Sequence, residues 1–221
     1  MNAPLPLEIS PDGLRPVAPG QWLDVGVEDT PPYGQPKQVE VAFVQNGKTE
    51  SVEPNLELND ELHLQVPRWL LPGDAVVKTR TRRDGRVSEW SQPARYELLE
   101  HPAAPFAESV QPIRKNELGK SEPLIYLEGA RSPVLTAEPG DRIAVRGHFP
   151  VESTSSMRIK LVNAARNVLI KPSETALTYS SYFEVELPPD LGADEWQVYI
   201  CEVVYGTSAR LMITLRVIRG H

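Results

Sequence analysis

The fold is decided by a stretch that occurs twice, APGQWLDVGV at residues 18–27 and EPGDRIAVRG at residues 138–147. In both copies a Pro-Gly turn leads into a run in which apolar side chains occupy every second position. These positions are Leu23, Val25 and Val27 in the first copy, and Ile143 and Val145 in the second, where Gly147 corresponds to Val27. Alternation with period two is typical of a half-buried β-strand. The stretch therefore predicts the same strand in each half of the chain.

The match between the halves continues at a spacing of about 120 residues, which indicates an internal repeat. The matched segments are 5–9 with 124–127, 39–43 with 157–161, 62–67 with 183–188, and 75–80 with 196–201. Each is short and alternating, and turn pairs such as Asn46-Gly47 and Asp84-Gly85 separate them. No segment of helical length carries an apolar stripe. We predict an all-β fold of two tandem immunoglobulin-like β-sandwich domains.

The composition places the domain boundaries in a proline-containing segment near the middle of the chain. Residues 101–121 begin with Pro-Ala-Ala-Pro after His101 and predict a semi-extended linker. The first domain is then expected at 1–100 and the second at 122–221. The alternative is one larger β-domain with a long excursion, which leaves the repeat unexplained.

A resemblance supports the sandwich prediction. The segment VVKTRTRRDGRVSEWSQP at residues 76–93 resembles the last hairpin of a fibronectin type III domain, with a basic alternating strand, a glycine turn, Ser-x-Trp-Ser and a proline. Cytokine receptors carry a longer version, Trp-Ser-x-Trp-Ser, and here Val87 stands at its first Trp. The Pro-Gly turns also resemble bacterial Ig-like and IPT-type repeats. That resemblance implies a stalk, an adhesin segment or an accessory domain.

Charge and hydropathy exclude several classes of function. The net charge is −7, so the chain lacks the basic footprint of a nucleic-acid-binding protein. No apolar run is long enough for membrane insertion. The first residues do not form a secretory signal, which predicts a cytoplasmic protein or export without an N-terminal signal. Cys201 is the single cysteine, so we expect no intrachain disulfide.

The sequence contains no recognisable catalytic or metal-binding motif. The histidines, His63, His101, His148 and His221, have no metal-ligand spacing, and one cysteine cannot build a zinc site. His63 is expected on the outward face of a strand. We therefore predict a protein that is not an enzyme and needs no cofactor or metal. The alternative is a dispersed active site in a cleft.

Basic residues in the first half form the clearest candidate contact surface. Lys78, Arg80 and Arg82 alternate on one strand and must share a face. Arg86 extends the charge around the turn, and Trp90 follows on the return strand. The structural interpretation is a cation–π ladder over the indole. The functional interpretation is an Arg/Trp patch that binds an acidic or polar partner.

Two loop aromatics complete the predicted partner-binding set. Trp69 lies in the connection at 67–73, and Tyr33 lies in the proline-rich loop at 28–36. The predicted function is a protein-interaction or spacer module in a bacterial surface or secreted assembly, with a protein partner or self-association through an edge strand. The alternative is a carbohydrate-binding accessory module whose platforms are exposed aromatic residues, with Trp22, Trp69, Trp90 and Trp196 as candidates.

Overall fold

The computed structural model describes residues 8–27, 38–56, 61–83, 85–114, 124–127, 132–173 and 181–218. The chain divides into two compact units, Met1–Ala103 (unit 1) and Ala104–His221 (unit 2). Apart from the short 3₁₀ turn η1 (Thr154–Ser156), all the regular elements that the structure describes are strands. None of the described segments is a helix long and apolar enough to cross a membrane.

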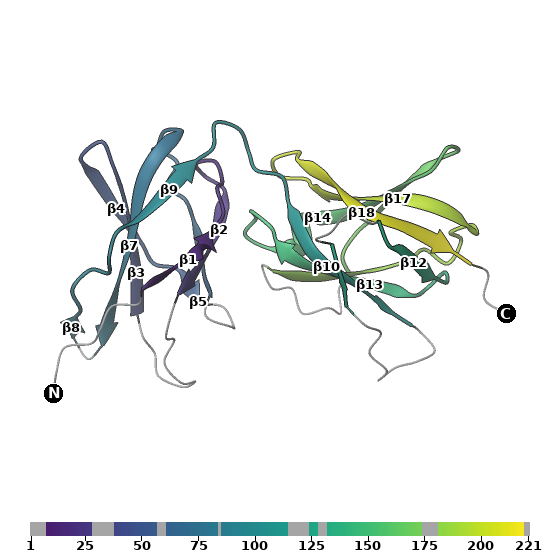
Figure 1. The fold of residues 1–221 in the computed structure, drawn as a ribbon, viewed down its shortest axis with the longest axis horizontal. Helices are drawn as coiled ribbons and strands as arrows, with labels where there is room; N and C mark the ends of the chain where they lie inside the picture. The colour runs from purple at the N-terminus through teal and green to yellow at the C-terminus, as the bar shows by residue number, and fades with distance from the viewer. Residues whose placement is uncertain are drawn as a thin grey trace. The chain divides into compact units, whose positions relative to one another are not determined.

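Unit 1 is built from two sheets (Figure 1). The first has the order β1 (Ile9–Leu14), β2 (Trp22–Val27), β6 (Glu61–Gln65) and β5 (Asn55–Leu56). The second has the order β4 (Lys48–Val52), β3 (Gln38–Gln45), β7 (Gly73–Arg83) and β8 (Arg86–Val87), and β9 (Ala94–Leu98) also pairs with β7. A parallel bridge between Val17 and Leu98 links the segment after β1 to the second sheet.

Unit 2 repeats this plan (Figure 1). Its first sheet has the order β11 (Ile125–Tyr126), β10 (Phe106–Ile113), β13 (Arg142–His148) and β16 (Tyr182–Glu186). Its second sheet has the order β12 (Val134–Ala137), β18 (Ser208–Val217), β17 (Asp194–Glu202), β14 (Met157–Val162) and β15 (Asn167–Ile170). Here the parallel link is four residues long, because β12 pairs with β18 from Val134 to Ala137.

Each unit encloses one core between its two sheets, formed by the alternating side chains that the sequence pattern had marked. Val25, Val41 and Phe43 are fully buried in unit 1, and Val145, Ile159 and Leu161 have the same place in unit 2. Alternation produces this core because successive side chains on a strand point to opposite faces. The sheet order and the two-layer core define immunoglobulin-like, fibronectin type III-like β-sandwiches. The predicted fold class is confirmed.

The predicted linker at 101–121 is wrong over much of its length. Residues 106–113 form β10, which pairs along its whole length with β13 as β1 pairs with β2. The two strands approach so closely at Gly147 that an added Cβ would lie 2.0 Å from the carbonyl oxygen of Phe106. The predicted match of 5–9 with 124–127 is also wrong, because β10 takes the position of β1 and β11 pairs on the other side of β10.

The outer side of the first sheet of unit 1 holds a buried polar group, His63, on the outward face that the sequence predicts. His63 does point away from the core, but it is only 1% exposed. Its Nδ1 lies 2.7 Å from Oδ1 of Asp24, and its ring stacks on Trp22 with centroids 4.7 Å apart. Strand parity predicts the side of the sheet correctly, whereas burial depends on the neighbours across the sheet.

Candidate binding surfaces

The Ser-Glu-Trp-Ser segment of unit 1 replaces an ordinary strand opposite β7. Ser91 N–H donates to the Thr79 carbonyl at 2.8 Å, and Ser88 N–H donates to the Thr81 carbonyl at 2.9 Å. The return segment therefore advances three residues, from Ser88 to Ser91, while β7 advances two, from Thr81 to Thr79. As a result, the backbone carbonyls of the return segment are out of register with the amides of β7. The serine hydroxyls fill the gap, because Ser91 Oγ accepts the Thr79 N–H and Ser88 Oγ accepts the Thr81 N–H, both at 2.9 Å.

The altered register places Trp90 on the outer face beside the basic stripe. Lys78 Nζ lies 4.8 Å from the centroid of the indole, and Arg80 Cζ lies 4.4 Å from it. Thr79 and Thr81, between the cations, are buried. Two of the predicted contact residues thus stack on a third within the same unit, in the arrangement of a cation–π ladder.

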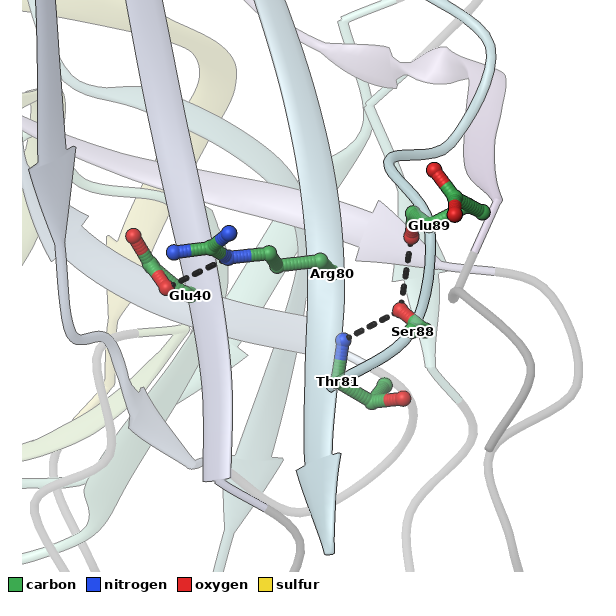
Figure 2. A network of polar contacts seen from close by, with 5 residues as sticks. All are labelled: Glu40, Arg80, Thr81, Ser88 and Glu89. Carbon is green, nitrogen blue, oxygen red and sulfur yellow. Dashed lines mark hydrogen bonds and ion pairs between the residues drawn. The ribbon is translucent and has the colours of Figure 1, made fainter. Parts of the chain in front are cut away.

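Arg80 also bridges two strands, as Figure 2 shows together with the hydrogen bonds of Ser88. Its Nε lies 2.6 Å from Oε2 of Glu40 on β3. The hydrogen bond from Arg80 lowers the pKa of the Glu40 carboxyl, and a hydrogen bond with Ser51 acts in the same direction. This guanidinium is therefore already occupied by one ring and one carboxylate.

The other predicted residues of unit 1 lie apart from this ladder. Arg82 and Arg86 are exposed at the end of the hairpin. Arg82 lines a small hollow together with Val39, Glu40, Glu53 and Arg80. The structure thus places the stripe on one face, while a partner-binding role for Lys78, Arg80, Arg82, Arg86 and Trp90 stays a prediction.

The loop aromatics do not join the stripe. Trp69 packs against the core of unit 1, its Nε1 donates to Oε2 of Glu50, and Lys48 Nζ lies 5.9 Å from its ring. These contacts correspond to the structural use of a loop aromatic, and a partner-binding role for Trp69 stays a prediction. Tyr33 lies outside the described residues.

None of the four tryptophans presents an open, exposed ring. Trp22 stacks on His63, Trp90 lies under two cations, and Trp69 packs on the core. Trp196 is 1% exposed, and Arg166 lies over its ring at 5.3 Å. A sugar-binding site needs aromatic faces open to the ligand, so these rings provide no such platform.

Titratable groups in unit 2 pair with one another on its first sheet. Glu184 accepts from Arg142 at 2.7 Å and from the Tyr182 hydroxyl. Burial, and then the hydrogen bond to Glu184, raise the pKa of the Tyr182 hydroxyl. Within the described ranges, no group of three or more His, Cys, Asp and Glu residues is arranged to hold a metal ion.

The outer face of the second sheet of unit 2 carries a surface that sequence reasoning missed. We call it the Lys160 face, and its residues are Arg158, Lys160, Leu169, Tyr199, Arg210 and Met212. Leu169 is 58% exposed and Met212 is 55% exposed. The residues come from four strands, β14, β15, β17 and β18. No short segment contains more than two of them, so no local motif announces the face.

No protein-family model matches the chain, and no curated protein matches its sequence. The structure of SGBP-B from the Bacteroides ovatus mixed-linkage glucan utilization locus, in complex with a mixed-linkage heptasaccharide, is 13% identical with a TM-score of 0.37. That match covers 92% of this chain and 44% of that chain, so this chain spans less than half of SGBP-B.

Two further solved structures are animal proteins. The FN1–FN3 domains of chicken CNTN1 are 13% identical with a TM-score of 0.35, and the match covers 98% of this chain and 69% of that chain. The chicken interferon gamma receptor alpha chain is 10% identical with a TM-score of 0.33, and the match covers 96% of this chain and 94% of that chain. The sheet order and the two-layer cores, by themselves, confirm the resemblance to fibronectin type III-like sandwiches as a statement about the fold.

Proposed function

We propose that this chain is a non-catalytic protein-interaction module and that the Lys160 face of unit 2 is its principal contact surface. The observation that carries the proposal is the exposure of Leu169 and Met212 on one face with Tyr199. Met, Tyr and Arg are enriched in protein interfaces, and large apolar side chains clustered on a sheet face favour a partner that covers them.

The strands supply a rigid support for this surface. Ile159, Leu161 and Ile200, which alternate with the outward residues of β14 and β17, are all fully buried. A contact surface on packed strands loses little conformational entropy when it binds, because its backbone is already ordered. The basic stripe of unit 1, with Arg82 and Arg86 at its open end, is a second contact surface under the same proposal.

The setting of the module is also part of the proposal. The Pro-Gly turns that resemble bacterial Ig-like repeats support a place in a bacterial surface or secreted assembly. In such an assembly the chain would act both as a spacer that positions the Lys160 face and as a module that binds a partner through that face.

Site-specific photo-crosslinking tests the proposal. A photoreactive amino acid is placed at Leu169 or Met212 of the full chain, which is expressed in the source cells. The control position is Leu71 of unit 1, whose 59% exposure matches the 58% of Leu169. We expect one discrete protein adduct at 169 and 212 but not at 71, and the purified adduct protein should bind the full chain in solution.

Two results would contradict the proposal. Equal adducts at all three positions would mean that exposure alone drives the reaction. A glycan adduct, or no adduct, at 169 and 212 would remove this face as a protein-binding surface.

A further inference from the structure

The Lys160 face contains one straight row of side chains that crosses four strands. Lys160 pairs with Leu169 on one side and with Tyr199 on the other, and Tyr199 pairs with Arg210. Directly paired residues on neighbouring strands project from the same face. The row therefore places a tyrosine between two cations, with a leucine at the open edge of the sheet.

A bulge in β18 adds Met212 to this row. The register passes from Gln197↔Thr214 to Tyr199↔Arg210, so three residues of β18 lie opposite one residue of β17. Leu211 and Ile213 keep their places in the core at 4% and 2% exposure. Met212 between them is directed outward, since bulges redirect side chains.

The two cations of the row have no counter-ion among the residues that the structure describes. Lys160 and Arg210 make no hydrogen bond or ion pair with any residue that the structure describes. Their neighbours differ, because Arg158 donates to the carbonyl of Ser155 at 2.7 Å and Arg216 pairs with Glu195 at 2.7 Å. Unpaired cations beside exposed apolar groups provide the charge complementarity that an acidic partner requires.

The positive charge of this face contrasts with the net negative charge of the chain. Unit 1 contains ten basic and sixteen acidic residues, and unit 2 contains thirteen basic and fourteen acidic residues. On the outer face formed by β14, β17 and β18, the described charged residues are four basic ones and one acidic one, namely Arg158, Lys160, Arg210, Arg216 and Glu195. A positive face on an acidic chain selects partners by charge and steers their approach.

We infer that the Lys160 face binds an extended, acidic protein segment, which seats carboxylates on Lys160 and Arg210 and apolar side chains on Leu169 and Met212. This inference rests on the proposed function and names the class of partner. The two cations are on strands separated by β17, so their backbones lie about 10 Å apart. An extended segment in the polyproline II conformation returns every third side chain to the same side, and three of its residues rise about 9 Å. Carboxylates at every third position, with apolar residues between them, therefore match the row.

The experiment uses the full chain and a synthetic peptide as a probe. The peptide is acetyl-GELPELPEG-amide, in which glutamates recur at every third position, and the control peptide replaces each glutamate with glutamine. Amide chemical shifts are followed by NMR during the titration. We expect the largest changes at residues 158–160, 169, 199 and 210–212, and none at the basic stripe of unit 1, whose Lys78 and Arg80 already contact Trp90.

Charge-matched variants test the assignment. Lys160→Gln combined with Arg210→Gln should weaken binding of the acidic peptide about tenfold, which corresponds to the loss of two exposed ion pairs. Arg68→Gln combined with Arg95→Gln removes the same charge from two exposed positions of unit 1 and should change affinity by less than about twofold. An equal loss in both double variants would overturn the inference.

The remaining outcomes distinguish the inference from the proposed function. Equal binding of the glutamine peptide, binding of a heparin oligosaccharide at these residues without binding of the acidic peptide, or concentration-dependent pairing of two copies through this face would each overturn the acidic-segment inference. If the acidic peptide fails while crosslinks still form at 169 and 212, the interaction function stands and only the partner class is wrong.

Discussion

The two units differ in the segment that pairs with the long strand β7 in unit 1 and with its counterpart β17 in unit 2. In unit 1 the return from β7 passes through Ser88 to Ser91, and two cations of β7, Lys78 and Arg80, lie over the ring of Trp90. In unit 2 β18 pairs with β17 as a continuous strand with one bulge. No tryptophan lies over Lys160 or Arg210 among the described residues.

The comparison teaches that a basic sheet face is not by itself a binding surface. The stripe of unit 1 is conspicuous in the sequence, yet much of its charge is used internally by one ring and one carboxylate. The face of unit 2 has no conspicuous motif, and its Lys160 and Arg210 have no ion pair with any described residue. The difference lies in the return segment, since only the one in unit 1 brings a tryptophan onto the outer face.

The largest effect is expected from a change that tests whether β10 belongs to unit 2 as β1 belongs to unit 1. Gly147→Ala places a Cβ 2.0 Å from the Phe106 carbonyl oxygen and 2.7 Å from Ala107 Cα. Val27 at the corresponding position of unit 1 already carries a side chain. We expect unit 2 to lose about 3 kcal/mol, because backbone must shift. Hydrogen exchange, followed separately in each unit, measures the loss.

Gly192→Ala is the matched control, because its new Cβ would meet only Arg166 Nη2, at an ordinary contact distance of 3.5 Å. Its effect should stay within about 0.5 kcal/mol. Wild-type protection of β10 and β13 in Gly147→Ala would contradict the close approach of these strands.

A smaller effect is expected from removing the serine hydroxyls that only unit 1 needs. Ser88→Ala combined with Ser91→Ala takes away the side-chain acceptors of the Thr81 and Thr79 amides. We expect unit 1 to lose about 2 kcal/mol, because the buried amides lose partners. Chemical denaturation followed by tryptophan fluorescence, together with hydrogen exchange of the β7 amides, measures the change in the free energy of unfolding.

The corresponding part of unit 2 supplies the control. Ser208→Ala alters an exposed serine at the start of β18 and should leave stability unchanged within about 0.5 kcal/mol. If the double variant of unit 1 were equally neutral, the hydroxyls would not be replacing strand hydrogen bonds.

The smallest effect is expected from a variant that compares Arg80, which contacts Trp90 and Glu40, with the two cations of the Lys160 face. Arg80→Gln removes the stack on Trp90 and the ion pair with Glu40, and should cost about 1 kcal/mol at neutral pH. Since Arg80 lowers the pKa of Glu40 in the folded state, the pair stabilises unit 1 above the usual glutamate pKa. That contribution is lost as the pH falls through the lowered pKa. The difference between wild type and variant, measured by urea unfolding, should therefore shrink in acid.

Lys160→Gln combined with Arg210→Gln is the counterpart in unit 2. These cations have no ion pair with any residue that the structure describes, so the stability should change by less than about 0.5 kcal/mol at either pH. A pH-independent loss in Arg80→Gln would show that the Glu40 pair contributes nothing to stability.

The sequence predicts the strands of both sandwiches well where alternation is uninterrupted and turns carry glycine. It fails at β10 for a physical reason. A register shift between Ala107 and Ser109 breaks the alternation, and the inward residues there include small Ala107 and Pro112, which contribute little apolar signal. The composition of this segment therefore predicts a linker where the chain forms a paired strand.

The sequence predicts one candidate surface and misses the other, because only the first is formed by residues close together in the chain. Lys78, Arg80 and Trp90 are neighbours on one hairpin, so strand parity and the turn are enough to predict that they meet. Lys160, Tyr199 and Arg210 meet only through the register of three strands and the bulge in β18. Such information is distributed over about 50 residues and is not present in any single motif.

The parallel pairing of β12 with β18 gives the two units different mechanical properties. When a chain is pulled along the strands, hydrogen bonds between parallel strands are loaded together in shear, whereas a single bridge bears the whole load and then breaks. Unit 2 has four such pairs, from Val134 to Ala137, and at this place unit 1 has the bridge between Val17 and Leu98. Stretching single molecules should therefore unfold unit 1 at the lower force, and a reversed order would mean that other contacts bear the load.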